Sequence, residues 1–459
     1  MIKFFIFIFS FLILTQFKFD PDLGWHLATG FHFLETGEIV QKDIFTWTLP
    51  GYEWGNRYFV YQILVAFLLS HLGYVITTMI FGILGSLAVL LLIPKKLDFP
   101  KLVAVFLGIG VAVTNLGLRP HMISFLMFSF LLLLLERRFF LRKIHALFWF
   151  AFFALWANFH QAFFVGVLTF GAFIFCDFLW QISNNKKKRD YFLGVRIFNA
   201  VLAFAGGFLT PFNFRLWGSL VDDLLGAKTW TAIAEWKSIA IYPPWSLLYA
   251  VSGLVFVYIL FKKFKDIEPV WFLLAAFIFM LPFLATNFVF FWAAIFIFLV
   301  SRHLEVEVNF KADLLAKIPI LFSTFAGGVA LVLGFFLGIF TSVDLDNRLR
   351  HDGYPVDAVN FLKKEGLSAG LFNSYAWGGY IEFAEVGTKV FIDGRMTGWR
   401  KPDGGYILAD YLAILSGDCD LARKYDIKLV LMEVNFKNDC FSDFREVYQD
   451  PVAKVLVKN

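Results

Sequence analysis

Charged residues are scarce in this chain of 459 amino acids. Asp, Glu, Lys and Arg make up 17% of it, whereas 59% is hydrophobic and 62 residues are Phe. Soluble domains are typically about 25% charged and about 45–50% apolar, so the composition predicts a polytopic membrane protein. The net charge is +5, and the basic residues fall in short clusters between apolar runs. This pattern is typical of membrane orientation and argues against a nucleic-acid partner.

Several catalytic motifs are missing as well. The sequence has no glycine-rich phosphate loop, no Ser-His-Asp arrangement and no compact His/Cys spacing for zinc. It also has no internal repeat of the kind found in transporters. Of the three cysteines, Cys176 lies in an apolar run, whereas Cys419 and Cys440 lie in the polar C-terminal part. A disulfide between the latter two requires that this part be extracytoplasmic.

Apolar runs that suit a bilayer core of about 30 Å recur along the chain. No small-x-small cleavage site precedes Asp20, so we expect the first run to be a retained span. We predict about eleven spans: 2–18, 75–93, 101–117, 121–135, 144–158, 162–181, 195–210, 246–261, 269–283, 285–301 and 318–340.

A further, moderately apolar run at 58–72 decides the orientation. If it lies flat as a juxtamembrane helix, Lys3 and all five basic clusters between spans fall on one side, as expected for the cytoplasm. The N-terminus is then cytoplasmic, and residues 18–74 form the first outer loop. We predict a transmembrane domain at 1–343 and an extracytoplasmic domain at 344–459, in a bacterial inner membrane.

The C-terminal part has a different pattern, because Gly, Asp, Lys and Asn return and the apolar runs shorten. Residues 355–366 read as a helix whose inward side chains are Val356, Val359, Phe361 and Leu362. Residues 389–393, 427–432 and 452–457 read as buried strands. Alternating helices and strands predict a small α/β domain.

The stretch Phe19-Asp-Pro-Asp follows the first apolar run directly. Carboxylates so close to hydrocarbon are costly and are often retained for chemistry, metal binding or ion handling. Asp20 and Asp22 could act as a general base or hold Mg²⁺ or Mn²⁺, with Pro21 keeping the backbone extended and His26 nearby. The alternative is an interfacial loop that happens to be acidic.

Other polar residues also gather at the predicted outer face. Arg119 could bind a phosphate bidentately, or it could anchor a span end. Asp43 reads as a turn or cap residue, with substrate binding as the other role. The remaining candidate substrate-binding residues are His26, His121, Asn158, His160, Glu235, Trp377 and Tyr380.

The order of these features resembles the GT-C superfamily of glycosyltransferases that use lipid-phosphate sugars. Phe19-Asp-Pro-Asp is similar to the Asp-Pro motif in the first outer loop of the oligosaccharyltransferase catalytic subunit, where an acidic residue helps bind metal and acceptor. Ser374-Tyr-Ala-Trp-Gly-Gly-Tyr380 resembles that enzyme's Trp-Trp-Asp-Tyr-Gly region, which recognises acceptor, but Gly378 or Gly379 replaces its Asp. The segments at Arg119, 156–160 and Glu235 resemble a broad group of bacterial membrane proteins of glycosyltransferase type.

The resemblance implies inverting transfer of a sugar from a polyprenyl-phosphate-linked donor in the bilayer to an acceptor at the extracytoplasmic face. Asp20 or Asp22 would be general base or metal ligand, and Arg119, His121 and His160 would serve phosphate or sugar. A glycan, a lipid or a protein remains open as the acceptor. A transporter or flippase is the rival class, but the span interiors carry almost no charge except Asp177. A non-catalytic assembly subunit is the third possibility.

Overall fold

The computed structural model describes residues 2–142, 145–183, 189–225, 233–306, 345–384 and 387–459. The chain divides into two compact units, which are described separately. The helical unit comprises Met1–Phe17, Val75–Leu209 and Ala234–Val343. The sheet unit comprises Lys18–Tyr74, Thr210–Ile233 and Asp344–Asn459. The first loop and the C-terminal residues therefore belong to one compact unit. The boundary at 343/344 was drawn between membrane and aqueous parts, and it stays a prediction.

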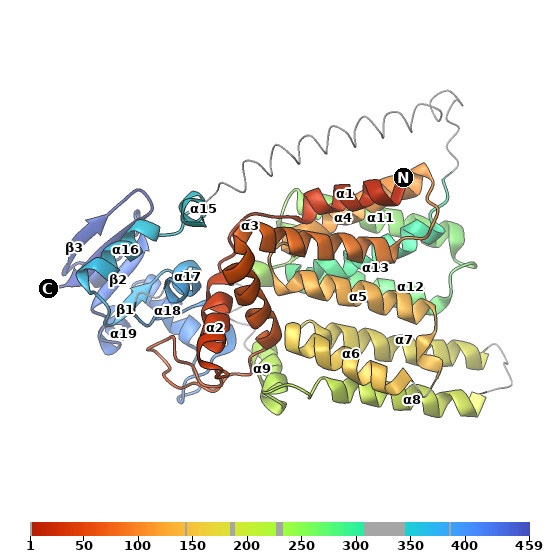
Figure 1. The fold of residues 1–459 in the computed structure, drawn as a ribbon, viewed down its shortest axis with the longest axis horizontal. Helices are drawn as coiled ribbons and strands as arrows, with labels where there is room; N and C mark the ends of the chain where they lie inside the picture. Colours follow the sequence, from red (N-terminus) through yellow and green to blue (C-terminus); the bar gives the residue numbers. More distant parts are fainter. Residues whose placement is uncertain (1, 143–144, 184–188, 226–232, 307–344, 385–386) are drawn as a thin grey trace, which may run out of the picture. The chain divides into compact units, whose positions relative to one another are not determined.

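Ten of the eleven predicted spans fall on apolar helices, and the eleventh, 318–340, lies outside the described residues. Within the described part, α3, α7, α11 and the segment Thr286–His303 are long and apolar enough to cross a membrane. The count of eleven therefore stays a prediction. The helices are α1 (Ile2–Leu14), α3 (Phe59–Leu92), α4 (Phe99–Ala112), α5 (Pro120–Glu136), α6 (Ala146–Phe159), α7 (Phe163–Ser183), α8 (Arg189–Gly206), α11 (Trp245–Lys263), α12 (Pro269–Leu284) and α13 (Val289–His303) (Figure 1).

The helical unit is built around α13, whose residues from Val289 to Ser301 are all buried. Helices α4, α5, α11 and α12 all contact it. The α4–α13 contact is close, because a Cβ at Gly108 would lie 2.4 Å from Cγ1 of Ile297. Local sequence sets the start of α4, where the Asp98 side chain accepts a hydrogen bond from the Lys101 amide and Pro100 occupies the first turn.

Helix α3 contains a break at Gly73, where φ is 75° and ψ is 172°. A residue with a side chain rarely adopts this left-handed conformation, so glycine permits the break. The break lies between the predicted juxtamembrane helix at 58–72 and the predicted span at 75–93. The part before it belongs to the sheet unit and the part from Val75 to the helical unit.

The sheet unit contains a four-stranded sheet of order β1-β2-β4-β3. Strands β1 and β2 are parallel, and the other two pairs are antiparallel. The strands are β1 (Leu371–Asn373), β2 (Leu429–Glu433), β3 (Phe444–Gln449) and β4 (Ala453–Lys458). The helices are α2 (Leu23–Thr36), α9 (Phe214–Leu225), α15 (Leu345–His351), α16 (Val356–Glu365), α17 (Gly378–Phe383), α18 (Ile407–Leu415) and α19 (Cys419–Lys424) (Figure 1).

The predicted helix at 355–366 is α16, which lies against β3 and β4. Its inward face is confirmed, since Val356, Val359 and Leu362 are at most 2% exposed and Phe361 is partly buried against Tyr448. The predicted strands at 427–432 and 452–457 correspond to β2 and β4, with boundaries shifted by one or two residues.

The prediction of a strand at 389–393 is wrong, although Val390, Phe391 and Ile392 are fully buried. The Asn373 side chain takes the place of a neighbouring strand: its Oδ1 accepts from the Phe391 amide at 2.8 Å, and its Nδ2 donates to the Ile392 carbonyl at 2.9 Å. Val390 forms a single bridge with Thr46 of the first loop. The apolar run is buried without joining the sheet.

The core of the sheet unit includes side chains of the first loop. Trp25 and Trp54 are 3% and 4% exposed and belong to the same apolar cluster as Phe391 and Trp399. Trp54 contacts Trp399, with ring centroids 5.9 Å apart. Residues far apart in sequence therefore bury their aromatic surface together, which is the dominant favourable term in folding.

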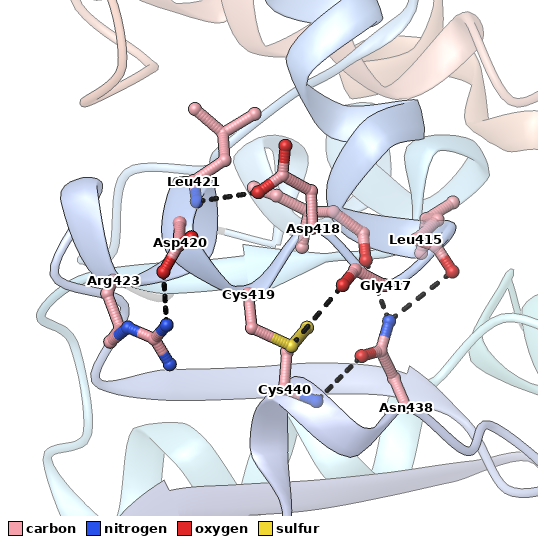
Figure 2. Close-up of a disulfide and its surroundings, with 10 residues drawn as sticks. Leu415, Gly417, Asp418, Cys419, Asp420, Leu421, Arg423, Asn438 and Cys440 are labelled. Atoms are coloured by element: carbon pink, nitrogen blue, oxygen red, sulfur yellow. Dashed lines mark hydrogen bonds and ion pairs between the residues drawn. A yellow bond between two sulfur atoms is a disulfide. The ribbon is translucent and has the colours of Figure 1, made fainter.

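A disulfide joins Cys419, at the start of α19, to Cys440 in a short turn (Figure 2). The Asp418 side chain accepts from the Leu421 amide and caps α19. On the other side, Nδ2 of Asn438 donates to the Ile414 carbonyl at the end of α18. The disulfide thus joins the connection between α18 and α19 to the turn that precedes β3.

Candidate functional site

The acidic stretch of the first loop forms a turn at the start of α2. The Leu23 amide donates to the Asp20 carbonyl at 3.0 Å, and the Asp22 amide donates to Oδ1 of Asp20 at 3.1 Å. Asp22 has helical dihedral angles as the N-cap of α2. The expectation that Pro21 keeps this stretch extended is wrong beyond Asp20, because the side chain of Asp20 closes a turn instead. Both carboxylates are partly exposed.

The carboxylate of Asp22 is held on two sides. Nε1 of Trp25, one turn into α2, donates to its Oδ1 at 3.0 Å. Gly394 of the C-terminal part faces the same oxygen so closely that a Cβ there would lie 1.9 Å from it. Glycine at 394 therefore leaves the space that this carboxylate occupies.

Gly379 lies against the acidic turn, whereas Gly378 lies against Ile392 and Asp393. A Cβ at Gly379 would lie 2.9 Å from both the Pro21 carbonyl oxygen and the Trp25 amide nitrogen, and one at Gly24 would lie 2.3 Å from backbone atoms of Gly379. Helices α2 and α17 therefore cross with their backbones in direct contact. At these two positions, where the resembling motif has an Asp, the glycines serve close packing.

Tyrosines and a further carboxylate surround the base of the turn. The Phe19 amide donates to Asp352 at 2.8 Å, and the Tyr354 hydroxyl donates to the Phe19 carbonyl at 3.2 Å. Burial raises the pKa of Tyr354, and the charges of Asp20 and Asp22 raise it further. Tyr380 lies beside Tyr354, with ring centroids 5.3 Å apart.

Four predicted substrate-binding residues are buried in the sheet unit: His26, Asp43, Trp377 and Tyr380. His26 is 2% exposed among the rings of Trp25, Tyr58 and Tyr61, and its Nδ1 lies 3.4 Å from Gln62. Trp377 is 6% exposed at the start of α17. These positions give His26 and Trp377 a packing role.

Asp43 belongs to a buried charge cluster that sequence reasoning did not assemble. The Arg395 guanidinium lies 2.6 Å from Asp393, 2.8 Å from Glu382 and 3.1 Å from Asp43. Asp43 also accepts from the Thr46 amide and hydroxyl, which confirms its turn role. Asp393 and Arg395 are two residues apart in the sequence, but no local pattern links either of them to residue 43.

Burial and charge shift the pKa values within this cluster. Burial raises the pKa of Glu382 well above its usual range. Burial also opposes ionisation of Asp393 and Arg395, but their mutual attraction wins, so the pKa of Asp393 is lowered and that of Arg395 is raised. The rings of Phe45, Trp54 and Trp399 lie within cation–π distance of Arg395.

The helical unit brings together four of its predicted site residues. Nη1 of Arg119, just before α5, lies 2.5 Å from Oε1 of Glu235, and both side chains are partly exposed. Next along the chain, the ring of His121 lies 4.5 Å from the ring of His160. Nδ1 of His160 is 2.7 Å from the Ser124 hydroxyl.

Ser124 also accepts a hydrogen bond of 2.7 Å from Nε1 of Trp156, so a buried chain of polar groups runs from α6 to α5. Ser124 was not predicted as a site residue, because a single serine in an apolar helix does not indicate a function. Asn158 has a different place: its Nδ2 donates to the carbonyls of Ala154 and Leu209 and links the ends of two helices.

Among the residues that the structure describes, no group of three or more His, Cys, Asp or Glu side chains could hold a metal ion. Asp20 and Asp22 form a pair, and such a pair suits Mg²⁺, which keeps several waters and commonly binds one or two carboxylates plus substrate phosphate. The metal assignment of these two residues stays a prediction.

Comparison with known proteins adds the fold class. No protein-family model and no curated protein matches the sequence. Two solved structures of an archaeal oligosaccharyltransferase from Archaeoglobus fulgidus are similar, each at 12% identity over 94% of this chain and 69% of the other. AglB in complex with an inhibitory peptide and a dolichol-phosphate has a TM-score of 0.55, and the apo form has 0.56. The chain therefore has a fold similar to that of this oligosaccharyltransferase, which is the fold that the resemblance implied.

Proposed function

We propose that this protein is a membrane glycosyltransferase that moves a sugar from a polyprenyl-phosphate-linked donor to an acceptor at the extracytoplasmic face. One observation carries the proposal: two partly exposed carboxylates lie at the start of α2, where Asp20 accepts from the Asp22 amide and Asp22 accepts from Trp25 in a space that Gly394 leaves open. The fold likeness to oligosaccharyltransferase supports it, because the similar AglB structure is a complex with a dolichol-phosphate and an inhibitory peptide.

In this proposal Asp20 or Asp22 acts as general base. The carboxylate takes the proton of the acceptor's nucleophilic group, whose atom forms a new bond to the anomeric carbon. The bond from that carbon to the phosphate oxygen breaks, and its electron pair leaves with the lipid phosphate, so the configuration inverts. Asp22 suits this role because Trp25 and Gly394 restrict its rotamer, and fixed geometry supplies much of enzymatic rate enhancement.

Mg²⁺ or Mn²⁺ fits the oxygen ligands that Asp20 and Asp22 offer. Such an ion would supply charge to neutralise the departing phosphate. In the helical unit, Arg119 and His121 are assigned to phosphate or sugar. Glu235 orients Arg119 through their ion pair. His160 is hydrogen-bonded to Ser124, and its ring packs against the ring of His121.

The transporter alternative gains no support from Asp177, the main charge expected within a span. Its carboxylate lies 2.7 Å from Arg196 and 3.0 Å from Arg138, and it is fully buried. A buried carboxylate between two guanidinium groups has the contacts of a structural ion pair. The Cys419–Cys440 disulfide supports an extracytoplasmic place for the C-terminal residues, since disulfides persist in oxidising compartments.

The test supplies the purified chain in lipid with a panel of polyprenyl-phosphate sugars and Mg²⁺ or Mn²⁺, and measures release of polyprenyl phosphate. Asp20→Asn and Asp22→Asn are compared with Asp420→Asn, whose carboxylate is 90% exposed. We expect release by the wild-type and control proteins and a loss of at least about 100-fold in one of the first two variants.

Release that survives both Asp20→Asn and Asp22→Asn would move the site to Glu235 and the histidines. No release from any donor by a folded protein would contradict the enzymatic proposal and favour a non-catalytic assembly subunit.

A further inference from the structure

The sheet unit contains a pocket of about 190 Å³ beside the buried Arg395 cluster. Its lining comes from the first loop at 52–57, from α9 at 215–222 and from 395–399. Pockets for drug-sized ligands measure roughly 300–1,000 Å³, so this one suits a single small group rather than a peptide or a lipid chain.

Aromatic rings line the pocket. Tyr52, which is partly exposed, stacks on Trp399 at a centroid distance of 4.6 Å, and the rings of Trp54 and Trp399 are 5.9 Å apart. Trp54 and Trp399 are 4% and 5% exposed, so neighbouring residues fix these rings. The ring that can present a face to a ligand is the partly exposed Tyr52, which Trp399 backs. An aromatic face of this kind suits the C–H face of a sugar ring, which is apolar although its rim is polar.

Polar groups of both signs share the lining. Glu53 lies 3.0 Å from Arg215, Asp222 lies 3.5 Å from Arg400, and Arg57 is 8% exposed. A carboxylate can accept two hydrogen bonds and a guanidinium group can donate two, so each can bind two neighbouring hydroxyl groups of a sugar.

The charges of the lining balance. Together with Arg400, which pairs with Asp222, four guanidinium groups stand against four carboxylates: Arg57, Arg215, Arg395 and Arg400 against Asp43, Glu53, Asp222 and Asp393. The further carboxyl of the cluster, Glu382, has a raised pKa because it is buried. A phosphate or polyanion would gain no net attraction there, so the lining favours a neutral polyhydroxyl group.

We infer that this pocket binds one sugar residue of a saccharide acceptor. That the bound saccharide is an acceptor rests on the proposed function, but binding of a saccharide to the pocket can be measured without any donor. The Asn-x-Ser/Thr type of acceptor is disfavoured independently, since Gly378 or Gly379 stands where the resembling motif has its Asp, and both are packed closely, Gly378 against Ile392 and Asp393 and Gly379 against Pro21 and Trp25.

The test uses the full chain in lipid nanodiscs with methyl glycosides of glucose, galactose, mannose and N-acetylglucosamine. Binding is measured by saturation-transfer NMR, with inorganic phosphate and a short peptide as competitors. We expect at least one glycoside to bind through its C–H face. Tyr52→Ala should weaken that binding about five- to tenfold, as expected for the loss of one aromatic contact.

Asp222→Asn preserves shape and should also weaken binding, so the test does not depend on one variant's folding. Tyr448→Ala is the matched control, because Tyr448 is a partly buried ring that stacks on Phe361. The inference is overturned if no glycoside binds, if phosphate or peptide binds instead, or if both pocket variants bind like the control. Binding in a protein that releases no polyprenyl phosphate would refute the transferase and leave the saccharide pocket standing.

Discussion

Replacing Arg395 by methionine should strongly destabilise the sheet unit at neutral pH. The guanidinium is fully buried and lies within 3.1 Å of Asp43, Glu382 and Asp393. Removing one partner of a buried ion pair typically costs about 3–5 kcal/mol, because the remaining charge stays buried without compensation. For a unit of this size, this corresponds to a fall in melting temperature of about 6–20 °C.

The loss should depend on pH in a defined direction. The lowered pKa of Asp393 means that its contribution to stability is present above its unfolded pKa, and is lost as the pH falls through the folded value. The raised pKa of Glu382 has the opposite sign: its contribution is present at low pH and is lost as the pH rises through the folded value. Without Arg395, ionised carboxylates are uncompensated at pH 7, whereas protonation near pH 4 removes their cost. The difference from wild type should therefore shrink on acidification.

The assay is thermal melting of the full chain in nanodiscs at pH 7 and near pH 4, followed by tryptophan fluorescence. Arg350→Met is the control, because Arg350 forms an exposed pair with Asp357, and exposed pairs contribute little. Equal losses in the two variants, or a loss in Arg395→Met that does not change with pH, would refute the reasoning.

Three further predictions concern packing and crosslinking. Gly379→Ala should disrupt the α2–α17 contact and abolish activity, whereas Gly171→Ala, which meets no atom within 4 Å, should be tolerated; thermal melting and the release assay check both. Replacing Cys419 and Cys440 by Ala should cost about 3 kcal/mol for a loop of this length, measured as a lower melting temperature that reductant reproduces in the wild type. Asn373→Leu should cost about 1–3 kcal/mol by leaving buried backbone groups of 391–392 unsatisfied, and an unchanged melting temperature would contradict that account.

Much of the helical unit could be predicted from the sequence because hydropathy is a local property. Each of the ten apolar runs that the structure describes became a helix, and the break before the second span coincides with Gly73, whose positive φ suits glycine. The clustering of Arg119, His121, His160 and Glu235 was predicted only as a shared face. Their pairings depend on helix rotation, which apolar composition leaves undetermined.

Strands β2 and β4 were visible as short buried runs, but the run at 389–393 shows the limit of that signal. Burial alone made it look like a strand, and the decision against it came from the side chain of Asn373, some 18 positions away. Hydrophobic pattern reports burial, whereas strand pairing requires a partner backbone in register.

The sequence by itself determined that the chain has membrane-type helices, an acidic motif after the first of them and a C-terminal α/β part. Only the tertiary structure decided that the first loop packs with the C-terminal residues, that Gly379 and Gly394 press on the acidic turn, and that Asp43 joins Arg395. These contacts join residues more than 300 positions apart. They form because the aromatic side chains of the two segments bury their surface together and the buried charges of the two segments pair with each other. A local sequence pattern does not contain this information.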